Sequence, residues 1–216
     1  MNFLDATNQV LRRLRERTVG SVTENDYSIL VGILLNDAKD EVEAAWNWSG
    51  LRNTITISTT PEVFAYELQG SNESSTILSV YNDTKDITME YRTADQFNEW
   101  YLKGTPPSGS PTYYSFNGLS SDGDTQMEVY PIPTATAETI RVNYLARGED
   151  LLLGTESFKV ASRPIVLLAY AKAVEERGED GGVGSSPAYA MARRSLNDMI
   201  SLDAGRHPEE LVWEAV

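Results

Sequence analysis

The chain has 216 residues, 41% of them hydrophobic, and its 18 basic and 32 acidic residues give a formal net charge of −14. A chain of this size can bury a substantial core in one or two compact units. None of the stretches 1–50, 51–147 and 148–216 is net basic, which argues against tight binding of a phosphate backbone, because that affinity depends on Lys and Arg. The acidic surface fits ordinary solubility, or nucleic acid that slides past without adhering.

The residues that carry most catalytic and metal chemistry are scarce. The chain has no cysteine and a single histidine, His207, so a Ser–His–acid set would have to use that residue and a metal site of His and Cys ligands is impossible. Asp122-Gly123-Asp124 resembles the start of a calcium loop but lacks the later acidic ligands, and we interpret it as a turn. We predict no catalytic residues, no bound metal and no cofactor.

Nothing in the sequence predicts a secretion signal or a membrane span. The first residues, Met1–Asp5, lack the basic and apolar regions of a signal peptide. No apolar run reaches the roughly 18–20 residues that cross a bilayer. The absence of cysteine fits a reducing compartment. We therefore expect a protein without a membrane partner.

The first predicted helix covers residues 3–16. Its apolar residues Phe3, Val10, Leu11 and Leu14 fall on one face. Arginines crowd its end, where cations complement the negative end of the helix dipole. A second interpretation of these arginines, contact with an acidic partner surface, stays open.

The second predicted helix runs from about residue 23 to about Trp46. Thr23, with the acidic Asp26 three residues later, matches a capping box. An apolar stripe follows at spacings of three and four residues, and charged residues occupy the opposite face. The stripe comprises Tyr27, Leu30, Val31, Leu34, Leu35, Ala38, Val42, Ala45 and Trp46, and the opposite face carries Asp37, Lys39, Asp40, Glu41 and Glu43.

From Leu51 the pattern changes to the alternating period of strands. Thr54–Ser58 alternates polar and apolar residues, as a half-buried strand does. A short helix that opens at the capping box of Thr93 and a Pro-rich loop at 104–111 interrupt the strand region. Further strands are predicted at 63–68, 76–81, 86–91, 112–117, 125–130 and 138–145.

Two more helices are predicted near the C-terminal end. The first opens with Ser162 and Pro164, and its segment Ile165–Val174 is apolar almost all round. Such a helix must be covered on more than one side. Because it is too short to cross a membrane, we expect a subunit interface to supply cover. Ser186 and Pro187 provide an N-cap and a first helical position for the last helix.

The pattern predicts an α+β fold, in which the N- and C-terminal helices form one α-helical bundle and an antiparallel β-rich domain is inserted between them. We assign residues 1–50 and 155–204 to the bundle, 51–154 to the insertion and 205–216 to a C-terminal tail. Exposed apolar residues in that tail are unfavourable in water, so we expect the tail to dock on a partner or a neighbouring subunit.

The order of several segments resembles a known protein family. They are, in chain order, the two opening helices, Asn36–Lys39, Glu43, Trp46–Trp48, Leu51-Arg52, the strand at 54–58, the β-rich insertion, and Arg163–Ala171 at the start of a long helix. In this layout the chain resembles the head-to-tail adaptor proteins of short-tailed bacteriophages, also called tail-tube gatekeepers. The resemblance covers about residues 3–204.

The resemblance implies a structural role and no enzymatic activity. Members of that family form a homo-oligomeric ring, usually of twelve subunits, beneath the portal protein. A helical bundle joins the portal side, and a β domain meets the tail nozzle or tube protein. The ring extends the channel through which DNA passes without tight binding. The protein would be made in the host cytoplasm and reside in the virion, at the tail or neck.

The same resemblance suggests interaction residues. Arg12, Arg13 and Arg15 are predicted to pair with acidic groups of the portal or of a neighbouring subunit. Two further sets are predicted to pack between subunits and to anchor the tail on the portal or an adjacent protomer: Ile165, Leu168, Tyr170 and Val174 for the first, and Leu211 and Trp213 for the second. For each residue the alternative is packing or solvation within its own subunit.

Other functions stay open at this point. A neck or tail-completion protein of a long-tailed phage would also be a virion component. A carbohydrate-binding or host-recognition module would stack sugars on aromatic residues such as Trp46, Trp48, Trp100, Tyr113 and Tyr114. An acid–base hydrolase would use a carboxylate pair, which 32 acidic residues could supply by accident. Imaging of the parent particle separates the two virion roles, and oligomeric state with glycan affinity separates the adaptor from the carbohydrate-binding module.

Overall fold

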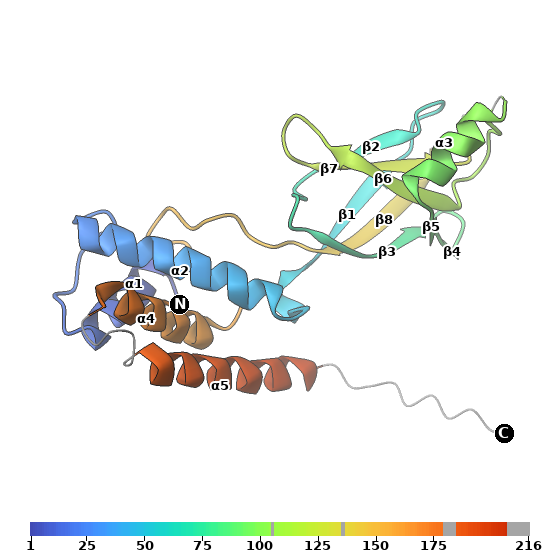
Figure 1. Cartoon of the computed structure of the whole chain (residues 1–216). Helices are drawn as coiled ribbons and strands as arrows, with labels where there is room; N and C mark the ends of the chain where they lie inside the picture. Colours follow the sequence, from blue (N-terminus) through green and yellow to red (C-terminus); the bar gives the residue numbers. More distant parts are fainter. Residues whose placement is uncertain (105, 135–136, 179–184, 207–216) are drawn as a thin grey trace, which may run out of the picture. The chain divides into compact units, whose positions relative to one another are not determined.

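A computed structural model describes residues 1–104, 106–134, 137–178 and 185–206. The chain forms two compact units (Figure 1). The helical unit comprises residues 1–50 and the chain from Gly148 onward, and the β unit comprises Leu51–Arg147. Within the described residues there are five α-helices and two sheets, which confirms the predicted α+β class.

Helix α1 (Phe3–Arg13) begins at an Asn2 side chain that accepts a hydrogen bond from the backbone N–H of Asp5. The predicted apolar face is buried. The helix ends earlier than predicted because Arg15 adopts a left-handed backbone conformation, with φ of 61°, and the Glu16 N–H bonds back to the carbonyl of Leu11.

Helix α2 (Asp26–Ala44) does not begin with the predicted cap. The Asn25 side chain accepts a hydrogen bond from the Ser28 N–H at 2.8 Å, and the Ser28 hydroxyl accepts one from the Asn25 N–H at 3.1 Å. This reciprocal pair is a capping box shifted by two residues. The Thr23 hydroxyl instead lies against that of Ser21. The prediction of Thr23 as the N-cap was therefore wrong.

We expect Asn25→Ala to lower the free energy of unfolding by about 1 kcal/mol, because the first turn of α2 loses its side-chain acceptor. Thr23→Ala is the matched control, and its effect should lie within about 0.5 kcal/mol of zero. Urea denaturation followed by circular dichroism at 222 nm measures both. Equal effects of the two substitutions would contradict the position of the cap.

Helix α4 (Ser162–Arg177) lies between its neighbours, with α1, α2 and α5 (Ser185–Ala204) all packed against it (Figure 1). This arrangement explains why its sequence is apolar almost all round. Helices of the same chain therefore supply much of the cover that the sequence required. The buried residues of α4 are Pro164, Ile165, Val166, Leu167, Ala169, Ala171 and Ala173.

The β unit contains two four-stranded sheets, with strand orders β1-β8-β3-β4 and β2-β7-β6-β5. All strand pairs are antiparallel except the short β5–β6 pair. The elements are β1 (Arg52–Ser58), β2 (Ala65–Leu68), β3 (Thr76–Asn82), β4 (Ile87–Thr88), β5 (Glu90–Tyr91), α3 (Ala94–Leu102), β6 (Tyr113–Leu119), β7 (Thr125–Tyr130) and β8 (Thr139–Leu145), and a 3-10 turn, η1 (Ser49–Leu51), precedes β1.

Both sheets contribute to one apolar core. Its buried residues are Leu68, Val80, Met89, Met127, Val129, Ile140 and Val142. The predicted strand at 86–91 is divided, because β4 pairs with β3 in one sheet and β5 pairs with β6 in the other. The residue between them, Met89, is buried, and its N–H donates to the carbonyl of Val80 at 2.9 Å.

Two local predictions in the β unit are confirmed. The Thr93 side chain and Gln96 form the predicted capping box of α3. The segment from Asp122 to Asp124 is a turn, in which Gly123 has a φ of +88°. The Asp124 carboxylate accepts a hydrogen bond from the Gly70 N–H at 3.0 Å, so it serves backbone structure there.

Candidate functional site

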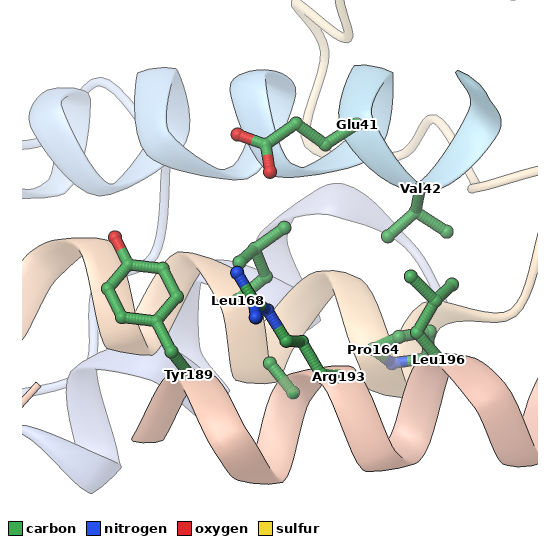
Figure 2. A pocket seen from close by; sticks show the side chains of 8 residues that line it. Glu41, Val42, Pro164, Leu168, Tyr189, Arg193 and Leu196 are labelled. Carbon is green, nitrogen blue, oxygen red and sulfur yellow. The ribbon is translucent and has the colours of Figure 1, made fainter. Parts of the chain in front are cut away.

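The helical unit contains a groove between α2 and α5, with α4 at its base (Figure 2). Its volume is about 200 Å³. The groove exists because α2 and α5 both pack on α4, and side chains of all three helices line it. The lining residues are Glu41, Val42, Pro164, Leu168, Tyr189, Ala192, Arg193 and Leu196.

The groove combines an apolar base with a cation, Arg193, that forms no ion pair with any acidic residue in the described part of the chain. Glu41 is already paired with Lys172, whose ammonium lies 2.6 Å from the carboxylate. The Arg193 side chain points into the groove (Figure 2), and within the described residues no acidic side chain forms an ion pair with it. The groove therefore suits a ligand that is apolar and carries negative charge.

Tyr189 closes one end of the groove. Its hydroxyl donates a hydrogen bond to the Glu175 carboxylate at 2.6 Å. Burial raises the pKa of Tyr189 to about 12, and the hydrogen bond to Glu175 and the charges of Glu175 and Glu41 act in the same direction. The hydroxyl thus stays protonated over the physiological range and fixes the orientation of the ring.

A second feature of the helical unit is the loop 148–153, which runs along another side of α2 (Figure 1). Asn36 exchanges two hydrogen bonds with the backbone of Leu151, at 3.0 and 3.1 Å. The Gly148 N–H donates to the Glu43 carboxylate at 3.1 Å, and the Lys39 ammonium donates to the Gly148 carbonyl at 2.8 Å. We call Asn36, Lys39 and Glu43 the α2 clamp.

Two residues of the α2 clamp are buried although the sequence pattern predicted them to be exposed. Lys39 and Glu43 were predicted on the solvent face, yet each is only 2% exposed. They cover the loop 148–153 in place of apolar side chains. Burial raises the pKa of Glu43 above its ordinary value of 4.5, and the nearby Lys39 charge and the Gly148 N–H oppose that shift.

The raised pKa of Glu43 gives a pH-dependent prediction. The folded state binds this proton more tightly than the unfolded state, so the stability linked to it is fully present below the unfolded pKa of 4.5 and is lost as pH rises through the folded value. Relative to Glu43→Gln, which cannot titrate, the wild type should gain stability as pH falls from 7 towards 4.5. Urea denaturation at several pH values measures this difference. A difference that does not change with pH would contradict it.

The loop 148–153 presents apolar side chains to solvent. Leu152 is 76% exposed and Leu153 is 65% exposed. The N–H groups of both residues donate to one Glu156 carboxylate oxygen, at 2.7 and 2.6 Å, which fixes the turn that displays them. We call Leu152 and Leu153 the leucine loop patch.

The predicted interaction residues fall in different environments. Arg12, Arg13 and Arg15 are exposed at the end of α1. Ile165 is fully buried in the helical unit, and Leu168 is half-buried in the groove. The remaining predicted residues are Tyr170 and Val174, which are half-buried, and Leu211 and Trp213, which lie outside the described residues.

The aromatic residues of the carbohydrate hypothesis do not form one open platform. Trp48 is 3% exposed, and its indole N–H donates to the Val42 carbonyl at 2.6 Å. Trp100 packs against Tyr130, with 4.7 Å between ring centroids, and against Tyr113, with 5.4 Å. These contacts use ring faces and edges for packing within the β unit.

Sequence reasoning missed the groove charges and the leucine loop patch. The run Leu151–Leu153, which follows the acidic pair Glu149-Asp150, was the available signal for the patch. Arg193 was not among the predicted interaction residues. Its position in the groove depends on the packing of α2 and α5 on α4, which no local pattern encodes.

The described residues show neither a metal-binding cluster nor a membrane-spanning helix. Among them, no group of three or more His, Asp or Glu side chains could hold a metal ion. No described helix combines the length and the apolar composition of a membrane span.

Comparison with known proteins identifies the family. A comparison with curated proteins gives no match. A family model described as SU10 adaptor protein matches residues 1–210, which include both units, the groove and the leucine loop patch. The chain therefore belongs to the SU10 adaptor protein family.

Proposed function

We propose that the chain is a ring-forming head-to-tail adaptor of a short-tailed bacteriophage. About twelve copies would form a closed ring that joins the portal protein to the tail nozzle or tube protein and extends the DNA channel. The observation that carries this proposal is the SU10 adaptor family match over residues 1–210. The protein then acts as a virion component of the tail or neck, made in the host cytoplasm, and not as an enzyme.

In this proposal the helices α1, α2, α4 and α5 work as one bundle that meets the portal, and the β unit meets the next tail component. The packing of α1, α2 and α5 around α4 supports a single helical module. The net charge of −14 supports passage of DNA without adhesion, because like charges repel in a confined channel.

Several residues receive roles in the ring. The exposed Arg12, Arg13 and Arg15 contact acidic groups of the portal or of a neighbour. Leu168 contacts a neighbouring subunit through the groove. Tyr170 and Val174, which point away from the groove around α4, contact a neighbour from another side of the helix. The buried Ile165 supports the helix from within, and the tail residues Leu211 and Trp213 anchor on the portal or an adjacent protomer.

The test is reconstitution with the portal protein of the same phage. We expect electron microscopy of the mixture to show a closed adaptor ring on one face of the portal, and light scattering to show the corresponding mass. A chain that stays monomeric and separate from the portal would refute the proposal. Imaging of the parent particle distinguishes a short tail from a long one, which separates this role from that of a neck protein.

The arginine cluster allows a sharper arm of the same experiment. The triple variant Arg12→Glu, Arg13→Glu, Arg15→Glu should lose portal binding or ring assembly. The introduced carboxylates would repel the acidic groups of the partner that the arginines are proposed to contact. Lys85→Glu, a charge reversal at an exposed lysine of the β unit, is the single-site control. Circular dichroism checks that each variant is folded. Unchanged assembly of the triple variant would remove the arginines from the interface.

A further inference from the structure

We infer that the ring closes through a head-to-tail contact in which the leucine loop patch of one copy enters the groove between α2, α4 and α5 of the next copy. The inference rests on the proposed ring and names the two surfaces that make it. It commits to a second copy of this chain as the occupant of the groove.

The first argument is that each surface is incomplete alone. Leu152 and Leu153 are 76% and 65% exposed although their turn is fixed by Glu156. Exposed apolar residues held in a fixed conformation mark a binding surface. The groove has an apolar base that includes Leu168, and it is open to solvent at a volume of about 200 Å³.

The second argument is charge complementarity. Two exposed carboxylates, Glu149 and Asp150, immediately precede the leucines. The groove contains Arg193, and the exposed Arg194 follows it on α5. Within the described residues none of these four side chains takes part in an ion pair. An acidic, leucine-bearing loop therefore matches an apolar groove that contains Arg193 and has Arg194 next to it on α5.

The third argument is the placement of the two surfaces on one subunit. Residues of an α-helix succeed one another at about 100°, so Asn36, which holds the loop, and Glu41, which lines the groove, point about 140° apart around α2. A loop on one side and a receptor on another is the arrangement that a heterologous contact requires. Such contacts generate a ring when the rotation between copies closes.

The test uses charge reversal in the full-length chain, assembled on the portal. The variant Arg193→Glu, Arg194→Glu should reduce ring yield by about tenfold or more, and so should Glu149→Arg, Asp150→Arg, because each places like charges across the contact. Combining all four substitutions in one chain restores opposite charges and should recover assembly. Lys85→Glu is the control, at an exposed lysine of the β unit outside both surfaces.

A second measurement exploits the absence of cysteine. An otherwise wild-type chain with Leu152→Cys and Leu196→Cys should form a ladder of disulfide-linked copies when assembled rings are oxidised, because the contact places residue 152 of one copy near residue 196 of the next. Leu152→Cys with Leu202→Cys is the control, because Leu202 is exposed on α5 but does not line the groove. This arm does not depend on the folding of the charge variants.

The outcomes separate the two proposals. If the wild-type chain forms no ring on the portal, both the adaptor function and this contact are refuted. If the wild type forms rings and the reversed variants do so equally well, or the two cysteine pairs cross-link equally, the contact is refuted and the adaptor function stands. Loss of assembly with recovery in the fourfold variant, together with a ladder confined to the groove pair, supports the contact.

Discussion

Replacement of Lys39 by alanine is expected to lower the free energy of unfolding of the helical unit by about 3–5 kcal/mol. The Lys39 side chain is 2% exposed, and its ammonium donates to the Gly148 carbonyl and to Asp40. Its removal leaves the buried Glu43 carboxylate without its nearby positive charge. The variant also leaves the Gly148 carbonyl without its Lys39 donor. An unsatisfied buried acceptor costs about 1–3 kcal/mol, and the lost compensation of the Glu43 charge adds to that cost.

The matched control is Lys172→Ala. Lys172 also forms an ion pair from a helix of the same unit, but its partner Glu41 is 56% exposed. An exposed pair of this kind contributes up to about 1 kcal/mol. Urea denaturation followed at 222 nm reports mainly on the helical unit. Similar losses of unfolding free energy in the two variants would show that Lys39 contributes no more to stability than an exposed ion pair does.

A double variant separates the charge from the packing. In Lys39→Met with Glu43→Leu, both buried charges disappear together and the side-chain volume is kept. We expect this variant to be more stable than Lys39→Ala, because neither buried charge is left behind without the other. The Gly148 N–H and carbonyl still lose their partners, so recovery to the wild-type value is not expected to be complete.

The α2 clamp also shows where sequence patterns stop being informative. Positions 39 and 43 lie outside the apolar stripe of α2, and a helical period assigns them to solvent. The segment that buries them begins at Gly148, more than a hundred residues later in the chain. Their burial is thus set by a tertiary contact, whereas Val31, Leu35 and Val42, which the stripe did place in the core, are buried as predicted.

The regular elements were predictable because their signals are local. The strand predicted at 138–145 is β8, and its alternating apolar residues Ile140, Val142 and Tyr144 are all buried. The start of α2 was less well determined, because both Thr23 and Asn25 are residue types that cap helices. Only Asn25 forms the reciprocal hydrogen bonds of a capping box. The groove was out of reach, since it arises from the packing of three helices that are distant in sequence.

Replacement of Gly50 by alanine is expected to lower the free energy of unfolding of the helical unit by about 2–3 kcal/mol. A Cβ atom at this position would lie under 3.0 Å from the backbone carbonyl of Lys159. A backbone atom cannot rotate away as a side chain can, so one of the two segments must shift. Overpacking that forces such shifts has a cost of about 1–3 kcal/mol.

Both segments at this contact are held in place. Next to Gly50, the Ser49 N–H and hydroxyl donate to the Asp203 carboxylate at 2.9 and 2.5 Å, and Trp48 is buried. On the other side, the buried Val160 follows Lys159 directly. Relief of the clash therefore disturbs either the Asp203 hydrogen bonds or the packing of Val160, which places the expected loss near the upper end of the range.

Gly20→Ala tests whether the effect belongs to the close approach and not to glycine replacement as such. Its nearest atom to an added Cβ is a Glu24 side-chain oxygen at 3.5 Å, an ordinary contact. We expect a change within about 0.5 kcal/mol, measured by urea denaturation beside Gly50→Ala. Equal stability of Gly50→Ala and the wild type would show that the Lys159 carbonyl leaves room for a Cβ atom at position 50. The close approach of these two backbone segments would then be refuted.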